Sequence, residues 1–274
     1  MENKFLTQRA GRFFTDKHRI CLFISVLLCE FSVSSVATMK SFAQGGMVKI
    51  PTGTYKGFYE NSQAEKIRVK TFYMDVHAVT NAQYLEFVKA NPIWSRSKVS
   101  RLYADAGYLK HWESDFKISR DKKMDNSPVV NVSWFAASAY CKWKGKRLPG
   151  LEEWEYAAKA KPDHSDIDKI ILNWYSKPNP VTLPNVGSAP SNSYKLQDMH
   201  GLIWEWVYDF NSVMLEGDSR SNAELNRNMF CAAGSAGVSD RKNYAAFMRF
   251  AFRSSLKANY TVNNLGFRCS KNVE

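Results

Sequence analysis

The stretch Gly145-Lys-Arg-Leu-Pro149, followed closely by Glu152-Glu-Trp-Glu-Tyr156, predicts where two helices meet in the middle of the chain. Its glycine suits the position just after a helix C-terminus and so ends a helix predicted over residues 133–144. Its proline cannot continue that helix, and the glutamates that follow favour the first turn of a new helix, predicted over residues 151–159. We expect the two cations of the stretch to serve in capping and ion pairing rather than in catalysis.

Around this junction the sequence predicts short strands and helices joined by long irregular segments. The other predicted elements are an edge strand over 45–55, a strand over 67–75 and a helix over 80–89 capped by Thr80 or Asn81. Residues 91–127 show no sustained period and are predicted as a long loop, and residues 161–197 as coil rich in Pro, Asn and Ser. The pattern indicates an α+β fold with much irregular backbone.

Residues 1–43 are predicted to be an export segment, which leaves residues 44–274 as one domain. Basic residues precede the uninterrupted apolar run Ile20–Cys29, which is too short to cross a bilayer and has the length of a signal-peptide core. Small-residue cleavage sites follow at Ser35-Val-Ala37 and Ser41-Phe-Ala43. An uncleaved anchor and a lipid on Cys29 remain alternatives. The expected location is the periplasm or the outer membrane.

The chain is basic, with a formal net charge of +12. Residues 1–43 contribute +3 of this charge, so the predicted domain keeps +9. Such a surface favours anionic partners: lipid headgroups, sulfated glycans or acidic protein faces. Because no recognition helix, zinc finger or RNA-binding motif is present, and because export is expected, nucleic acid is not an expected partner.

Three of the five cysteines lie in the predicted domain: Cys141, Cys231 and Cys269. An odd number in an oxidising compartment predicts one disulfide and one remaining thiol. The spacing alone does not choose the pair.

Four motifs follow one another in an order that resembles the formylglycine-generating enzyme, or sulfatase-modifying factor, family. They are the two quoted above, Asp198-Met-His-Gly201 with Trp204-Glu-Trp206, and Asn264-Leu-Gly-Phe-Arg268-Cys269. The resemblance covers about residues 45–271 and implies a loop-rich variant of the C-type lectin fold. It also implies a disulfide between Cys141 and Cys269, so that Cys231 would be the remaining thiol.

The resemblance further implies a calcium-binding turn. By position, its oxygen ligands would be the Asp198 side chain, the Gly201 and Ile203 carbonyls and the Glu205 carboxylate, in keeping with the preference of Ca²⁺ for oxygen. A metal-free turn, in which Glu205 pairs with Arg268 or Arg253, is the alternative.

The two cysteines that perform the family's oxidation are missing here. Counted back from Cys269, their positions hold Asp240 and Ala245, which cannot bind copper(I) as paired thiolates do. We therefore expect neither copper nor a catalytic residue of the family type. The vacated cleft would be lined by Trp204, Asp240, Tyr244 and Arg249.

These observations favour an exported, non-catalytic protein that binds or supports other components of the cell envelope. Members of this kind resemble the lipoproteins of type IX secretion and gliding machinery. One alternative is an enzyme with altered chemistry around Asp240. Another is a lectin-like, ligand-binding variable protein, suggested by the asparagines near the C-terminus.

Overall fold

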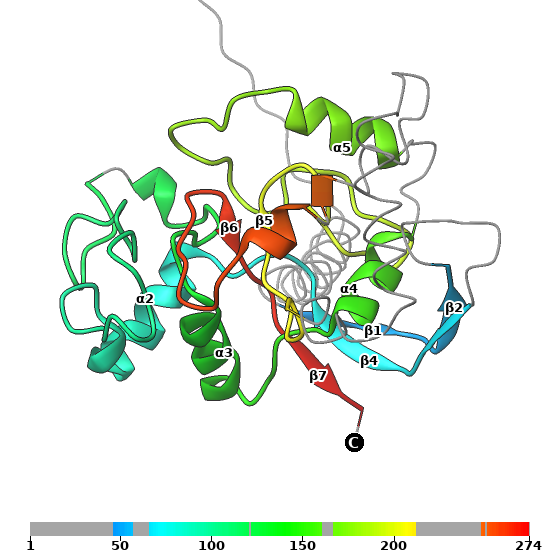
Figure 1. Cartoon of the computed structure of the whole chain (residues 1–274), viewed down its shortest axis with the longest axis horizontal. Coiled ribbons are helices and arrows are strands. Elements are labelled where there is room, and N and C mark those ends of the chain that lie inside the picture. Colours follow the sequence, from blue (N-terminus) through cyan, green and yellow to red (C-terminus); the bar gives the residue numbers. More distant parts are fainter. Residues whose placement is uncertain are drawn as a thin grey trace, which may run out of the picture. The chain divides into compact units, whose positions relative to one another are not determined.

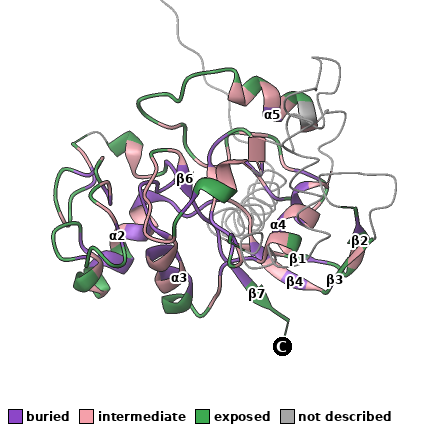
Figure 2. Ribbon diagram, viewed as in Figure 1, coloured by how far each residue is buried: buried purple, intermediate pink, exposed green. Residues whose placement is uncertain are grey.

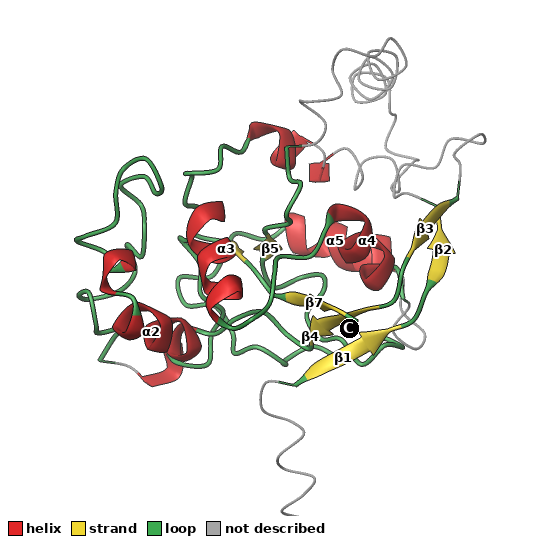
Figure 3. Cartoon of the chain, turned by 90° about the horizontal axis from the view of Figure 1, so that it is seen from below, coloured by secondary structure: helices red, strands yellow, loops and turns green. Residues whose placement is uncertain are grey.

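The main sheet joins strands from both ends of the chain that the structure describes. The computed structural model describes residues 46–56, 66–120, 122–160, 167–211, 248–249 and 251–273, and from Met47 onward the chain forms one compact unit. The strands β1 (Met47–Ile50), β4 (Phe72–Asp75) and β7 (Ser270–Asn272) form an antiparallel sheet in the order β1-β4-β7 (Figure 3). Met47 lies opposite Asp75, and Ser270 lies opposite Met74.

Each of the two strands predicted from alternation is in fact divided into two. The first becomes β1 and β2 (Gly53–Tyr55), and the second becomes β3 (Ile67–Val69) and β4, with β2 paired to β3 in a separate sheet. Pro51, which has no N–H to donate, stands at the break in the first strand. Beside it, Thr52 N donates to Thr71 Oγ1 at 3.0 Å and Thr52 Oγ1 donates to Val69 O at 2.9 Å. Side-chain bonds therefore replace the ladder where both strands bend.

The three predicted helices are confirmed, with each boundary within one residue of its predicted position. They are α2 (Asn81–Ala90), α3 (Trp134–Trp143) and α4 (Leu151–Ala158). Thr80 caps α2 in a capping box with Gln83, and Ser133 caps α3 by accepting from Ala136 N. After α3, Gly145 has φ +68°, the left-handed conformation that glycine adopts without strain.

The coil predicted over 161–197 is wrong in part, because α5 (Ile167–Tyr175) lies within it (Figure 1). The apolar residues Ile167, Ile170, Ile171 and Trp174 have the spacing of one helix face, a signal outweighed by the Pro- and Asn-rich flanks.

The predicted loop over 91–127 is irregular, as expected, but much of it is packed. It contains the short 3-10 helices η1 (Pro92–Trp94) and η2 (Lys122–Met124). Tyr108, Leu109 and Trp112 are buried, and Trp112 Nε1 donates to Asn81 Oδ1 of α2 at 2.8 Å. We call residues 91–120 the lobe; it extends beside α2 and much of its outer surface is exposed (Figures 1 and 2).

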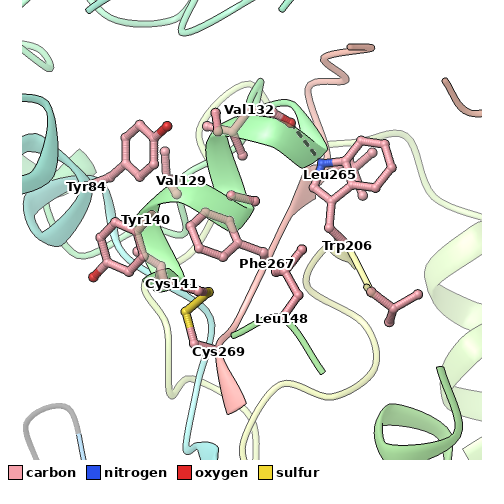
Figure 4. Close-up of a cluster of buried hydrophobic side chains, with 14 of the residues drawn as sticks. Tyr84, Val129, Val132, Tyr140, Cys141, Leu148, Trp206, Leu265, Phe267 and Cys269 are labelled. Carbon is pink, nitrogen blue, oxygen red and sulfur yellow. Dashed lines mark hydrogen bonds between the residues drawn. A yellow bond between two sulfur atoms is a disulfide. The ribbon is translucent and has the colours of Figure 1, made fainter. Parts of the chain in front are cut away.

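The core gathers around the final motif (Figure 4). Phe267 is fully buried and its ring lies 5.3 Å from that of Tyr140, which in turn stacks on Tyr84 at 5.7 Å. Just before it, the short strand β6 (Leu265–Gly266) pairs in parallel with β5 (Trp204–Glu205). A Cβ on Gly266 would stand 2.3 Å from Val129 O, so this motif requires glycine. Among the described residues, no helix is long and apolar enough to span a bilayer.

Candidate functional site

Trp204, at the start of β5, is the centre of a group of stacked aromatic rings. Its ring lies 4.4 Å from that of Phe252 with an interplanar angle of 26°, and 5.3 Å from that of Tyr175 with an angle of 19°. Trp174 adds a third, tilted contact at 5.4 Å. The partners come from α5 and from the helical residues 251–255, so β5 holds two distant segments together. All four residues keep partial exposure.

Arg249 lies next to these rings and brings a positive charge to them. Its Cζ atom lies 5.2 Å from the centre of the Trp154 ring, within the range of a cation–π contact. Burial lowers the pKa of Arg249, and the nearby charge of Glu155 opposes that shift. The Tyr55 hydroxyl donates to Glu155 Oε2 at 3.3 Å, and burial raises the pKa of Tyr55. The set Trp154, Glu155, Tyr175, Trp204, Arg249 and Phe252 is called the Trp204–Arg249 cluster below.

This cluster offers binding chemistry: flat apolar faces beside a guanidinium group and a carboxylate. Within the described part of the chain, no group of three His, Cys, Asp or Glu side chains could hold a metal ion. His200 lies edge-on to Trp154 at 5.7 Å, and burial, with Arg249 adding to it, lowers its pKa to about 3. It is therefore neutral at physiological pH, and Nε2 lies 3.2 Å from Ala158 O, a contact to the backbone.

Of the four side chains predicted to line the cleft, the structure brings Trp204 and Arg249 into one cluster, linked through Tyr175. Asp240 and Tyr244 lie outside the described residues, as do Ala245 and Cys231. Tyr175 and Trp174 were not predicted as site residues because α5 was not predicted. The helical spacing of its apolar residues was the sequence feature that could have indicated it.

The Glu205 side chain, 1% exposed, points to Arg268, which is 0% exposed. Arg268 Nε donates to Glu205 Oε2 at 2.8 Å, Nη2 donates to Oε1 at 2.9 Å, and Trp154 Nε1 donates to Oε2 at 2.7 Å. The remaining Arg268 donors reach the carbonyls of Asp75, Val76 and Gln197. This ion pair is the alternative that the sequence offered to a calcium site.

Asp198, the other predicted calcium carboxylate, is buried and bonded to backbone. Its two oxygens accept from Gly187 N and from Ala189 N, the latter at 3.0 Å. Both carboxylates thus accept N–H donors, as they would in the metal-free turn that the sequence offers as the alternative. The ligand set Asp198, Gly201, Ile203 and Glu205 stays a prediction.

The motif over residues 145–149 and the disulfide connect elements of the fold that are distant in sequence. Cys141 of α3 and Cys269 form a disulfide across 128 residues. Lys146 Nζ donates to Asp75 Oδ1 at 2.5 Å, and the Arg147 guanidinium binds both oxygens of Glu153 at 2.6 Å. Ion pairing is thus the role in which the structure places these two cations.

The family comparison agrees with this arrangement of motifs. A model described as the sulfatase-modifying factor enzyme 1-like domain matches residues 33–273. The formylglycine-generating enzyme of Streptomyces coelicolor is 28% identical over 282 residues, covering 84% of this chain and 90% of that protein. The inactive C-alpha-formylglycine-generating enzyme 2 of Bos taurus is 27% identical, covering 82% of this chain and 85% of its own.

A longer relative shares only this region. The serine/threonine-protein kinase pkn1 of Chlamydia caviae is 29% identical over 263 residues, covering 89% of this chain but 40% of that protein. The chain thus spans well under half the length of that relative, so the activity in that protein's name is not carried over.

Proposed function

Because the chain belongs to the sulfatase-modifying factor family, we propose that it is an exported, non-catalytic member that binds or supports other components of the cell envelope.

The cysteines provide the evidence that the protein is non-catalytic. The disulfide uses Cys141 and Cys269, both fully buried, and Cys231 is the one other cysteine in residues 44–274. Copper(I) selects sulfur ligands, and the oxidation performed by the family's enzymes, as the resemblance implies, needs two thiolates side by side. One thiol cannot supply that pair, and Asp240 and Ala245 add none.

The Trp204–Arg249 cluster supports a binding role in place of the lost chemistry. Partly exposed aromatic side chains bind planar or apolar groups, and a guanidinium group beside them attracts carboxylate, sulfate or phosphate. The formal charge of +9 on residues 44–274 favours the same anionic partners. An envelope protein with an acidic, aromatic-containing segment would satisfy both features.

The envelope location follows from the basic and apolar character of residues 1–43. Type IX secretion and gliding lipoproteins, which the sequence resembles in lacking the cysteine pair, are the proposed setting. Calcium is not required by this proposal.

A crosslinking pull-down of the full-length chain from its own cell envelope, read by mass spectrometry, tests the binding role. We expect a defined set of envelope proteins, reduced at least severalfold for Arg249→Gln. The matched control is Lys142→Gln, which removes an exposed cation from the last turn of α3, away from the cluster, and is expected to recover the full set. Recovery of the protein alone would contradict the binding role.

A separate assay tests the non-catalytic role. The purified chain, loaded with copper(I), is incubated aerobically with a cysteine-containing sulfatase peptide, and aldehyde is measured by mass spectrometry. We expect none; aldehyde formation above the rate without protein would overturn this part of the proposal.

A further inference from the structure

The lobe presents large apolar side chains to solvent on one short folded segment. Ile93 is 71% exposed, Leu102 80% and Tyr103 48%. Single exposed apolar residues are ordinary on protein surfaces, but clustered ones indicate an interaction site. The ring of Tyr103 lies 5.9 Å from that of Trp94, so the segments that carry Leu102 and Ile93 meet at this contact.

The backbone beneath these side chains is tightly turned rather than extended. Val99 N donates to Ser95 O at 3.0 Å, and Tyr103 N donates to Ser100 O at 2.9 Å. Val99 is buried in the core, and the Tyr103 ring also contacts Phe135 of α3 at 5.4 Å. The turns that carry the exposed apolar side chains are therefore fixed by these hydrogen bonds and packing contacts.

The charges around them are mostly positive. Arg96, Lys98 and Arg101 are exposed, and residues 87–104 contain no acidic residue. The acidic side chains of neighbouring turns are engaged by donors of the protein: Asp115 by Ser97 N and Oγ at 2.8 and 2.5 Å, and Asp105 by Gly107 N at 2.9 Å and by Thr261. The three exposed cations outnumber the Asp115 carboxylate, which keeps its negative charge beside Ser97, so the surface has a net positive charge.

We infer that this surface, made of Ile93, Lys98, Arg101, Leu102 and Tyr103, docks on an anionic lipid bilayer. Aliphatic side chains at turn tips can enter the boundary between headgroups and acyl chains, and tyrosine is favoured there. Basic side chains beside them are attracted by anionic headgroups. This inference rests on the proposed envelope location and names the surface that would face the membrane.

Vesicle sedimentation of the full-length chain measures the predicted binding. Vesicles of phosphatidylcholine with and without phosphatidylglycerol are compared, and residues 1–43 are common to all variants, so only ratios between variants are interpreted. We expect Leu102→Ser to lower partitioning onto the anionic vesicles roughly tenfold, from the loss of one inserted apolar side chain. Arg101→Gln is expected to lower it about fivefold. The matched control is Val181→Ser, an apolar residue fully exposed elsewhere, which is expected to change nothing.

A photo-crosslinking amino acid at position 102, with position 181 as control, identifies the partner directly. The expected result is a lipid adduct at 102 on anionic vesicles and none at 181. Equal partitioning of Leu102→Ser and Val181→Ser, or a protein adduct at 102 in envelope fractions, would overturn the inference. Either result leaves the pull-down on Arg249→Gln unaffected, so failure of this surface is distinguishable from failure of the proposed function.

Discussion

The buried pair of Glu205 and Arg268 gives the sharpest prediction, tested by the substitution Glu205→Gln. The side chain keeps its size, but the guanidinium group loses the negative charge that it contacts through three donor–acceptor pairs of 2.8 to 3.0 Å. Because neither side chain is accessible to water, hydration cannot replace that charge. The variant therefore leaves an uncompensated cation in the interior.

Removing one partner of a buried pair destabilises proteins by about 3–5 kcal/mol. In a domain of this size, 1 kcal/mol corresponds to about 2–4 °C in melting temperature. We therefore expect Glu205→Gln to lower the melting temperature by roughly 6–20 °C, measured by circular dichroism.

The matched control is Glu153→Gln. Glu153 also binds an arginine through both oxygens, but the side chain of Arg147 is 35% exposed and that of Glu153 is 19% exposed. Solvent screens such a pair, so its loss is expected to cost about 1 kcal/mol or less. Equal shifts for the two variants would refute the argument from burial.

A double variant, Glu205→Leu with Arg268→Met, separates charge from hydrogen bonding. Apolar replacement of an isolated buried pair is often neutral. Here it would also leave the carbonyls of Asp75, Val76 and Gln197 without the Arg268 donors, at about 1–3 kcal/mol for each one left unsatisfied. We expect the double variant to remain less stable than the wild type; full recovery would show that these carbonyl contacts contribute little.

Three further measurements follow from the described residues. Burial lowers the pKa of His200 to about 3 and that of His111 to about 4, so both side chains bind protons more readily in the unfolded chain. The free energy of unfolding should therefore fall by about 2.7 kcal/mol per pH unit as the pH is lowered from 6.5 towards about 4. In a variant with His111→Asn and His200→Gln, the fall should be less steep. A slope equal in both proteins would show that these histidines do not govern it. Reduction of the Cys141–Cys269 disulfide should lower the free energy of unfolding by about 5 kcal/mol in the chain-entropy model, measured by denaturant titration with and without reductant. Millimolar Ca²⁺ should leave the melting temperature unchanged, because Asp198 already accepts two backbone N–H donors; a rise abolished by Asp198→Ala would restore the calcium assignment.

Features that depend on local sequence could be predicted. The caps Thr80 and Ser133 and the stop at Gly145 act within one turn of the backbone, so α2 and α3 were expected almost to the residue. The resemblance implied the pairing of Cys141 with Cys269, which spacing alone had left open.

Features that depend on contacts between distant segments could not be predicted from the sequence. The bend between β3 and β4 depends on Thr52 bonding across to Val69 and Thr71, which alternation along one strand does not reveal. For the same reason Trp204 could be named as a site residue, but its stacking on Tyr175 and Phe252 could not, because those rings come from other segments.

The strand order β1-β4-β7 also determines how the unit would respond to tension. Since β1 and β7 each run antiparallel to β4, they run parallel to one another, and a force applied between Met47 and Asn272 acts along the strands. The ladder bonds would then be loaded together, in shear, rather than opened one at a time. Cys269, just before β7, is tied covalently to α3, so the force reaches a crosslink on that side. Separation of β7 from the sheet would therefore stop at Cys269, whereas β1 and β4 contain no cysteine that could stop their separation.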